Sequence, residues 1–234
     1  MKGIKYVFFD CMETLVDLTE LPAMRDYALW AYQGSGVEGL WRGFEEFLEG
    51  YAWAKESLHA SLAQYEECEM YRRLELAVRQ KLVHREEKEI FEVSKRLYHN
   101  FWKTYRSKCY VKEDVKSVLP KLKERFPLGV VSNFMVEDGI EELLSQNGII
   151  RFFDFVVTSI REGWRKPHPA IYHSALSKAG VLPEEVVFIG DDYVNDYVTP
   201  GSLGMKTVLL DRYGKHGGAD PRVGDFYELM GILL

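Results

Sequence analysis

The chain has 234 residues, a formal net charge of -6 and 47% hydrophobic residues. This length is enough for a full α/β core with an inserted subdomain, and the mild acidity without a lysine/arginine stripe argues against a nucleic-acid surface. No apolar run is long enough to span a bilayer, so we expect neither nucleic acid nor a membrane as a partner.

The first predicted element is a strand over residues 6–9, an aromatic and β-branched run typical of a strand buried on both faces. The run ends at Asp10, a residue that strands avoid. In an open α/β sheet, catalytic groups lie just beyond the carboxyl ends of the strands. Asp10, with the Thr14 hydroxyl four residues on, therefore suggests an attacking carboxylate beside a hydrogen-bonding group. Taken alone, Asp10 is equally compatible with a turn cap.

Residues 18–110 are helical in character, because apolar residues recur at helical spacing and no strand pattern interrupts them. The predicted helices cover residues 21–32, 37–57, 66–83 and 86–105. A stretch of about ninety residues without a strand indicates a separate domain. We therefore expect an inserted α-helical domain at residues 17–110.

Strands and helices alternate in the rest of the chain. Strands are predicted at 128–132, 155–158, 186–189 and 206–210, and helices at 115–125, 136–147, 170–179 and 225–230. This alternation is typical of a doubly wound parallel sheet with right-handed crossovers. The sequence thus predicts an α/β core formed by residues 1–16 and 111–234.

Polar and charged side chains follow four of the predicted strands. They are Asp10 with Thr14, Ser132 with Asn133, Lys166, and Asp191 with Asp196. Because the loops after parallel strands gather at one edge of the sheet, these residues are expected to converge. Ser132 and Asn133 lie directly after a predicted strand and before a predicted helix, where they offer hydroxyl, amide and backbone donors to an anion, so we expect Asn133 to bind substrate.

The order of these groups resembles the haloacid dehalogenase-like hydrolase superfamily, whose members are mostly phosphatases. The resemblance covers residues 1–16 and about 111–234, and the helical segment resembles the cap domain of that family. It is carried by Ser132-Asn133, by Arg165-Lys166-Pro167-His168-Pro169 leading to Ile171-Tyr172, and by Gly190-Asp191 with Asn195-Asp196.

The resemblance implies a role for each site residue. Asp10 would be the nucleophile, and Thr14, Ser132 and Lys166 would hold the transferring group. The implied ligands of Mg²⁺ are Asp10, the backbone carbonyl of Met12, Asp191, and Asp196 either directly or just behind the others. Charge supports the metal independently, because three aspartates against one lysine leave a site that would repel phosphate until a hard dication neutralises it.

Met12 departs from the family pattern. Family phosphatases usually have a second aspartate at this position, which protonates the leaving group and then activates water, and a thioether can do neither. Glu13 is the nearest acid, but it occupies a position where the family usually has glycine. We expect a phosphatase with an aspartyl-phosphate intermediate that is slow, prefers good leaving groups, or takes its acid from the cap or the substrate.

Three alternatives stay open. A metal-independent 2-haloacid dehalogenase also lacks that aspartate, and Leu40-Trp41-Arg42 resembles the stretch where such enzymes place a substrate-binding arginine, here Arg42. Asp191 argues against this alternative, because its charge would repel a carboxylate. The other two are a phosphonate hydrolase using Lys55 and a non-catalytic protein that binds a phosphorylated ligand.

The cysteines and the N-terminus predict a location. Cys11, Cys68 and Cys109 show neither metal-ligand spacing nor a disulfide framework, which is typical of a reducing compartment. The chain enters a predicted strand almost at once, so no signal peptide is expected. We expect a cytoplasmic protein, monomeric or homodimeric, acting on a small molecule such as a phosphorylated metabolite or a haloacid.

Overall fold

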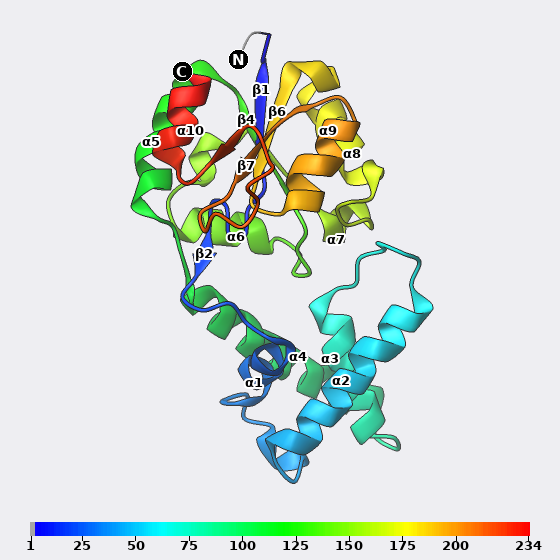
Figure 1. Cartoon of the computed structure of the whole chain (residues 1–234). Coiled ribbons are helices and arrows are strands. Elements are labelled where there is room, and N and C mark those ends of the chain that lie inside the picture. Colours follow the sequence, from blue (N-terminus) through cyan, green and yellow to red (C-terminus); the bar gives the residue numbers. More distant parts are fainter. Residues whose placement is uncertain (1–2) are drawn as a thin grey trace. The chain divides into compact units, whose positions relative to one another are not determined.

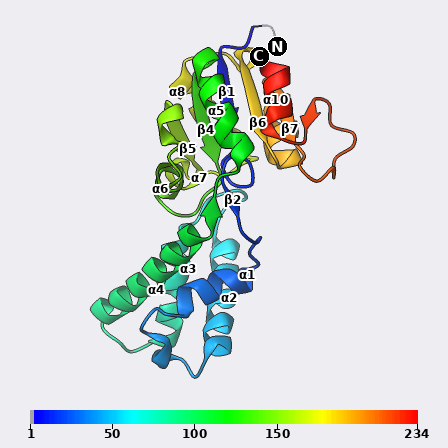
Figure 2. The ribbon, with the colours of Figure 1, turned by 90° about the vertical axis from the view of Figure 1, so that its left-hand side faces the viewer.

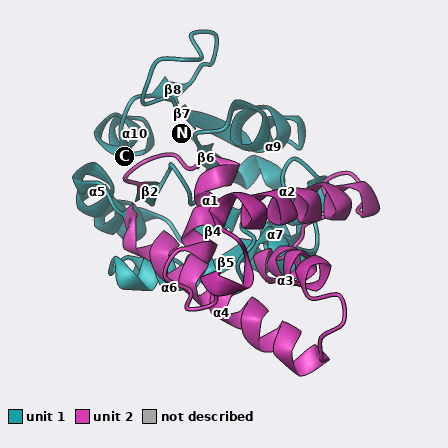
Figure 3. Cartoon of the chain, turned by 90° about the horizontal axis from the view of Figure 1, so that it is seen from below, with its two compact units in different colours: residues 1–17, 110–234 teal, residues 18–109 magenta. Residues whose placement is uncertain are grey.

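The computed structural model describes residues 3–234. The chain forms two compact units, residues 1–17 with 110–234 and residues 18–109 (Figure 1, Figure 3). The sequence places these boundaries at 16/17 and 110/111.

The first unit contains a six-stranded sheet, and all of its neighbouring strands are parallel (Figure 2). The strand order is β5 (Phe155–Thr158), β4 (Leu128–Ser132), β1 (Tyr6–Phe9), β6 (Val186–Gly190), β7 (Lys206–Leu210) and β8 (Arg222–Val223). The predicted α/β class with a parallel sheet is confirmed. The short strand β8 is absent from the sequence prediction.

Helices cover both faces of this sheet, with α5 and α10 on one side and α8 and α9 on the other in Figure 1. Their bounds are α5 Glu113–Arg125, α6 Gly139–Gln146, α7 Ser159–Glu162, α8 Pro169–Ala179, α9 Thr199–Ser202 and α10 Phe226–Leu233. Gly180 caps the end of α8, and its φ of 65° favours a residue without a side chain.

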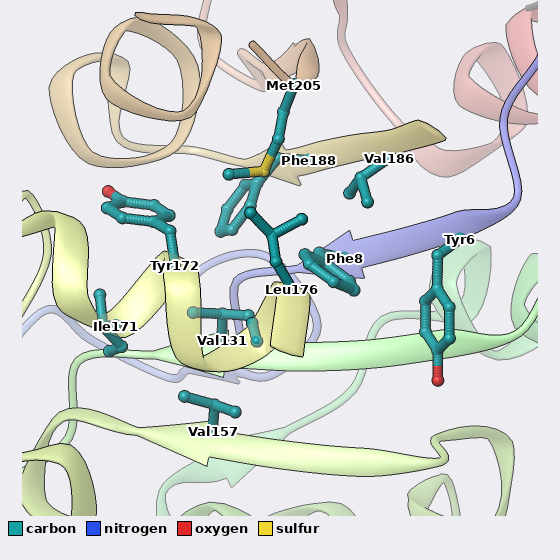
Figure 4. Close-up of a cluster of buried hydrophobic side chains, with 11 residues drawn as sticks. Tyr6, Phe8, Val131, Val157, Ile171, Tyr172, Leu176, Val186, Phe188 and Met205 are labelled. Carbon is teal, nitrogen blue, oxygen red and sulfur yellow. The ribbon is translucent and has the colours of Figure 1, made fainter. Parts of the chain in front are cut away.

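Strand β1 lies in the middle of the sheet, and alternate side chains point to opposite faces. Phe8 joins a buried cluster on the α8 face that includes Tyr172 and Phe188 (Figure 4). On the other face the Phe9 ring stacks on Phe226 of α10, with centroids 5.8 Å apart. Burying each of these side chains contributes about 2–3 kcal/mol, so the end of β1 is held rigidly.

The second unit is helical, with α1 at Met24–Tyr32, α2 at Phe44–Ser61, α3 at Met70–Lys81 and α4 at Glu87–Ser107. The prediction of one continuous helix over 37–57 is wrong at its start. A short 3₁₀ turn at Glu38–Leu40 is followed by a break, and α2 begins only after Gly43. Glycine disfavours the helix here, while Trp41 turns inward against Phe47, with ring centroids 5.0 Å apart.

Where the chain passes from one unit to the other, β2 (Asp17–Leu18) pairs with β3 (Cys109–Tyr110). These two-residue strands are too short to produce a pattern in the sequence. Among the helices of residues 3–234, none has the length and apolar character needed to cross a membrane.

Candidate active site

Asp10 occupies the first position after β1, at the carboxyl edge of the sheet. Its backbone N–H donates to the Ile189 carbonyl at 2.9 Å, which continues the pairing of β1 with β6 by one residue. Its side chain is 9% exposed. A carboxylate in this position has little water around it and depends on the protein for its partners.

Lys166 connects two of the predicted site carboxylates. Its Nζ donates to Asp10 Oδ1 at 2.7 Å and to Asp196 Oδ1 at 2.6 Å, and all three side chains are buried. Burial alone would lower the pKa of Lys166, but the charges of Asp10 and Asp196 outweigh it and raise that pKa. The ammonium group therefore stays protonated and offsets one of the negative charges.

Asn133 fixes the backbone that carries this lysine. Its Nδ2 donates to the Lys166 carbonyl at 3.0 Å, and the Lys166 N–H donates to its Oδ1 at 2.6 Å. The nitrogen and the oxygen of the Asn133 amide therefore both form hydrogen bonds with the backbone of a residue 33 positions further along the chain. This geometry makes Asn133 a positioning residue for Lys166, and its contact with substrate stays a prediction.

Asp196 lies on a π-helix, Tyr193–Val198, directly after β6. A Cβ at Gly190 would overlap the Asp196 carboxylate, so only glycine allows this close approach. Asp192 is exposed and caps the π-helix by accepting from the N–H groups of Val194 and Asn195 at 2.9 and 2.8 Å. Asp192 therefore supports the turn and lies outside the cluster of buried acids.

Three carboxylates meet at this edge. Asp10, Asp191 and Asp196 each offer an oxygen, and these oxygens lie within 4.8 Å of one another. Burial raises the pKa of Asp191, and the Asp10 and Asp196 charges raise it further. Burial and Asp10 likewise raise the pKa of Asp196, against the opposing charge of Lys166. The cluster has more negative charge than Lys166 alone neutralises, which fits an oxygen-liganded divalent cation.

The turn after Asp10 fits the same cation. The N–H groups of Leu15 and Val16 both donate to the Cys11 carbonyl, and the Glu13 N–H donates to the Val16 carbonyl. None of these bonds uses the Met12 carbonyl. The turn therefore leaves the Met12 carbonyl oxygen out of its own hydrogen bonds, and a carbonyl oxygen two residues after the first carboxylate suits a hard cation.

Two predicted hydroxyl groups complete the edge. The buried Thr14 donates from Oγ1 to Asp191 Oδ1 at 3.2 Å, which links the turn after β1 to the end of β6. Ser132 is also buried, and its Oγ has no hydrogen-bond partner among the described residues. A buried hydroxyl without a partner is costly, so a ligand oxygen is a natural partner for Ser132.

Glu13 adopts a left-handed conformation with φ of 61°. This backbone region favours glycine, which explains why the resemblance places glycine here. Burial raises the pKa of Glu13, and the charges of Asp10 and Asp17 add to the effect, while Lys215 and Lys112 oppose it.

Arg42 lies in the helical unit and is exposed. Its backbone N–H donates to Glu46 Oε2 at 2.6 Å, and its Nε lies 3.6 Å from Glu46 Oε1. Lys55 is half-buried on α2 of the same unit. The substrate-binding roles of both residues stay predictions.

Tyr172 belongs to the motif that carries the family resemblance, but its supporting contact at the site was not predicted from the sequence. Its buried ring packs in the core under β6, and its hydroxyl donates to the Asn195 carbonyl within the π-helix. The hydroxyl thereby anchors the turn that carries Asp196. An aromatic residue in a helix is typical of a core residue, so the sequence carries no signal for this contact.

Sequence comparison identifies the family that this sheet edge suggests. The chain belongs to the haloacid dehalogenase-like hydrolases, whose family profile matches residues 4–199. This match confirms the resemblance seen in the motifs and the prediction of a hydrolase. The relatives include phosphatases.

Two relatives and one solved structure illustrate the similarity. The chain is 48% identical over 83 residues, 36% of its length, to haloacid dehalogenase-like hydrolase domain-containing protein 3 of Xenopus laevis, where the match spans only 33% of that protein. It is 30% identical to glyceraldehyde 3-phosphate phosphatase of Pyrococcus furiosus, over 94% of this chain and 85% of that one. A 2-haloacid dehalogenase structure from Pseudomonas syringae superposes with a TM-score of 0.80 at 20% identity, covering 98% of both chains, which shows the shared fold.

Proposed function

We propose that this chain is a Mg²⁺-dependent phosphatase of small phosphorylated molecules that acts through an aspartyl-phosphate on Asp10. The observation that carries the proposal is the meeting of Asp10, Asp191 and Asp196 around one point beside Lys166. The similarity to a glyceraldehyde 3-phosphate phosphatase over most of both chains supports the substrate class.

In the proposed first step, a carboxylate oxygen of Asp10 attacks phosphorus as the bond to the ester oxygen breaks. Lys166, Ser132 and Thr14 hold and orient the phosphoryl oxygens. A bound Mg²⁺, held by Asp10, Asp191 and the Met12 carbonyl with Asp196 behind them, would supply positive charge to that group. Water then cleaves the aspartyl-phosphate, which releases phosphate and restores Asp10.

Met12 is expected to limit the rate with substrates whose leaving group needs a proton. The departing oxygen needs a proton unless it is a stable anion, and the thioether has none to give. Esters with good leaving groups should therefore react faster than alkyl esters. Glu13, with its left-handed backbone, lies in the same turn and is the nearest alternative acid in the sequence; the cap and the substrate are the other proposed sources of a proton.

A 2-haloacid dehalogenase is the second candidate. Met12 and the Leu40-Trp41-Arg42 segment favour it, since haloacid substrates need no leaving-group acid and offer a carboxylate to an arginine. Asp191 opposes it, because a third carboxylate at this edge repels an anionic substrate. A phosphonate hydrolase, a non-catalytic phosphoryl-ligand binder, the cytoplasmic location and the monomeric or homodimeric state remain predictions.

The deciding experiment assays phosphate esters and 2-chloropropionate with added Mg²⁺ and with EDTA, using Asp10→Asn as the blank. We expect phosphate release that EDTA abolishes. Halide release that persists in EDTA would instead establish the dehalogenase.

A further inference from the structure

Arg73 is a buried cation of the helical unit. It lies on α3 and is 9% exposed, and its Nη1 donates to the Tyr51 hydroxyl at 3.1 Å. The guanidinium carbon lies 5.6 Å from the centroid of the Tyr51 ring. Its Nε is buried and donates to no group among the described residues.

The charge of Arg73 has no anionic partner in the part of the chain that the structure describes. No carboxylate of the described residues forms an ion pair with it, although Glu67 and Glu69 are near enough to influence the pKa of Cys68. Burial raises the pKa of Tyr51, with Arg73 opposing, and burial also raises the pKa of Cys68, so both neighbours are neutral. A guanidinium taken out of water without a counter-ion is costly, and an added anion would offset that cost.

The surrounding donors suit an oxyanion. A guanidinium presents a planar pair of N–H groups that matches two oxygens of a carboxylate or phosphate. The Tyr51 hydroxyl accepts from Arg73, and its one acceptor among residues 3–234 is the Met70 sulfur at 3.6 Å. A thioether is a weak acceptor, so this hydroxyl can turn to a stronger one at little cost.

We propose that Arg73 and the Tyr51 hydroxyl form an oxyanion-binding site in the helical unit, for a carboxylate or phosphate group of a small ligand. The site goes beyond the proposed phosphatase function, since it uses neither Asp10 nor the metal-binding carboxylates. Either proposal can therefore fail in its experiment while the other stands.

The test follows the Nε–Hε NMR resonance of Arg73 in the ¹⁵N-labelled full chain, assigned by its loss in Arg73→Lys. Sodium phosphate and sodium succinate are titrated separately to about 50 mM, against sodium chloride at equal ionic strength. We expect a saturable shift of the Arg73 resonance with one or both oxyanions and none with chloride. The phosphate and succinate arms show which oxyanion is preferred. An Arg73 resonance that does not move with either would overturn the proposal.

Arg72 supplies the matched control, because it is the neighbouring arginine and is exposed. The oxyanion that shifts the resonance should raise the melting temperature of Arg72→Gln as much as it raises the melting temperature of the unsubstituted chain. It should raise the melting temperature of Arg73→Gln by less. An equal rise in both variants contradicts the site. If Arg73→Gln does not fold, the resonance of the unsubstituted chain decides the question alone.

Discussion

Lys166 and Asp196 form an ion pair of 2.6 Å in which the two side chains are only 2% and 1% exposed. Removing one partner of a buried pair leaves an uncompensated charge and costs about 3–5 kcal/mol. Lys166→Met should therefore lower the free energy of unfolding by about that amount and abolish phosphatase activity. Urea denaturation followed by circular dichroism measures the first effect.

Lys178 provides the comparison, since it is 46% exposed and lies 3.7 Å from Glu162. Lys178→Met should change the unfolding free energy by less than about 0.5 kcal/mol and leave activity intact. Equal destabilisation by the two substitutions would show that the buried pair has no special role.

Met12→Asp should raise turnover of phosphate esters, because it supplies the missing proton donor beside the leaving group. General acid–base help is worth about 10²–10⁴-fold, and the gain should be largest for alkyl esters with poor leaving groups. Met12→Asn has the same shape without the acid and should give no gain. An unchanged rate in a folded Met12→Asp variant would mean that another group already supplies the proton.

Much of this site could be predicted because it depends on local patterns. Strands β1, β4, β5 and β6 are mostly apolar runs, and a parallel sheet brings the ends of such runs together wherever they lie in the chain. Asp10, Lys166 and Asp191 could therefore be expected at one edge from their places after predicted strands. The alternation of strands and helices likewise predicted the parallel α/β sheet that the structure has.

The remaining features depend on tertiary contacts that leave no pattern in the sequence. The reciprocal bonds between Asn133 and Lys166 join residues from two separate loops. The π-helix that carries Asp196 is anchored by the Tyr172 hydroxyl, which looks like an ordinary core residue. The break before α2 could be predicted only from the inward packing of Trp41, which is a tertiary contact. These features are set by contacts between residues far apart in the sequence, which local patterns do not report.

Glu13→Gly should be more stable than Glu13→Ala by about 1 kcal/mol. Both substitutions remove the carboxylate, but only glycine relieves the left-handed backbone at φ of 61°. Comparing the two variants by urea unfolding isolates the backbone effect from the charge. Equal stability would show that the turn relaxes to accept a side chain.

Gly190→Ala should inactivate the enzyme and destabilise it, because the added methyl group overlaps the Asp196 carboxylate. The π-helix would have to move, and the ion pair with Lys166 would be lost. Gly217→Ala is the matched control, since nothing lies within 4 Å of a Cβ there. Activity and melting temperature are measured for both, and full activity in Gly190→Ala would contradict the close approach.

Mg²⁺ should stabilise the protein, and by more at pH 8 than at pH 5. The pKa values of Asp191 and Asp196 are raised in the metal-free fold, so the folded state binds more protons than the unfolded chain above about pH 4, and stability falls as the pH rises. Bound Mg²⁺ offsets the repulsion among the three carboxylates and competes with the protons that Asp191 and Asp196 bind. Melting temperatures with Mg²⁺ and with EDTA across this range measure the difference, and Asp191→Asn should flatten it. A gain that is constant with pH would mean that the cation binds elsewhere.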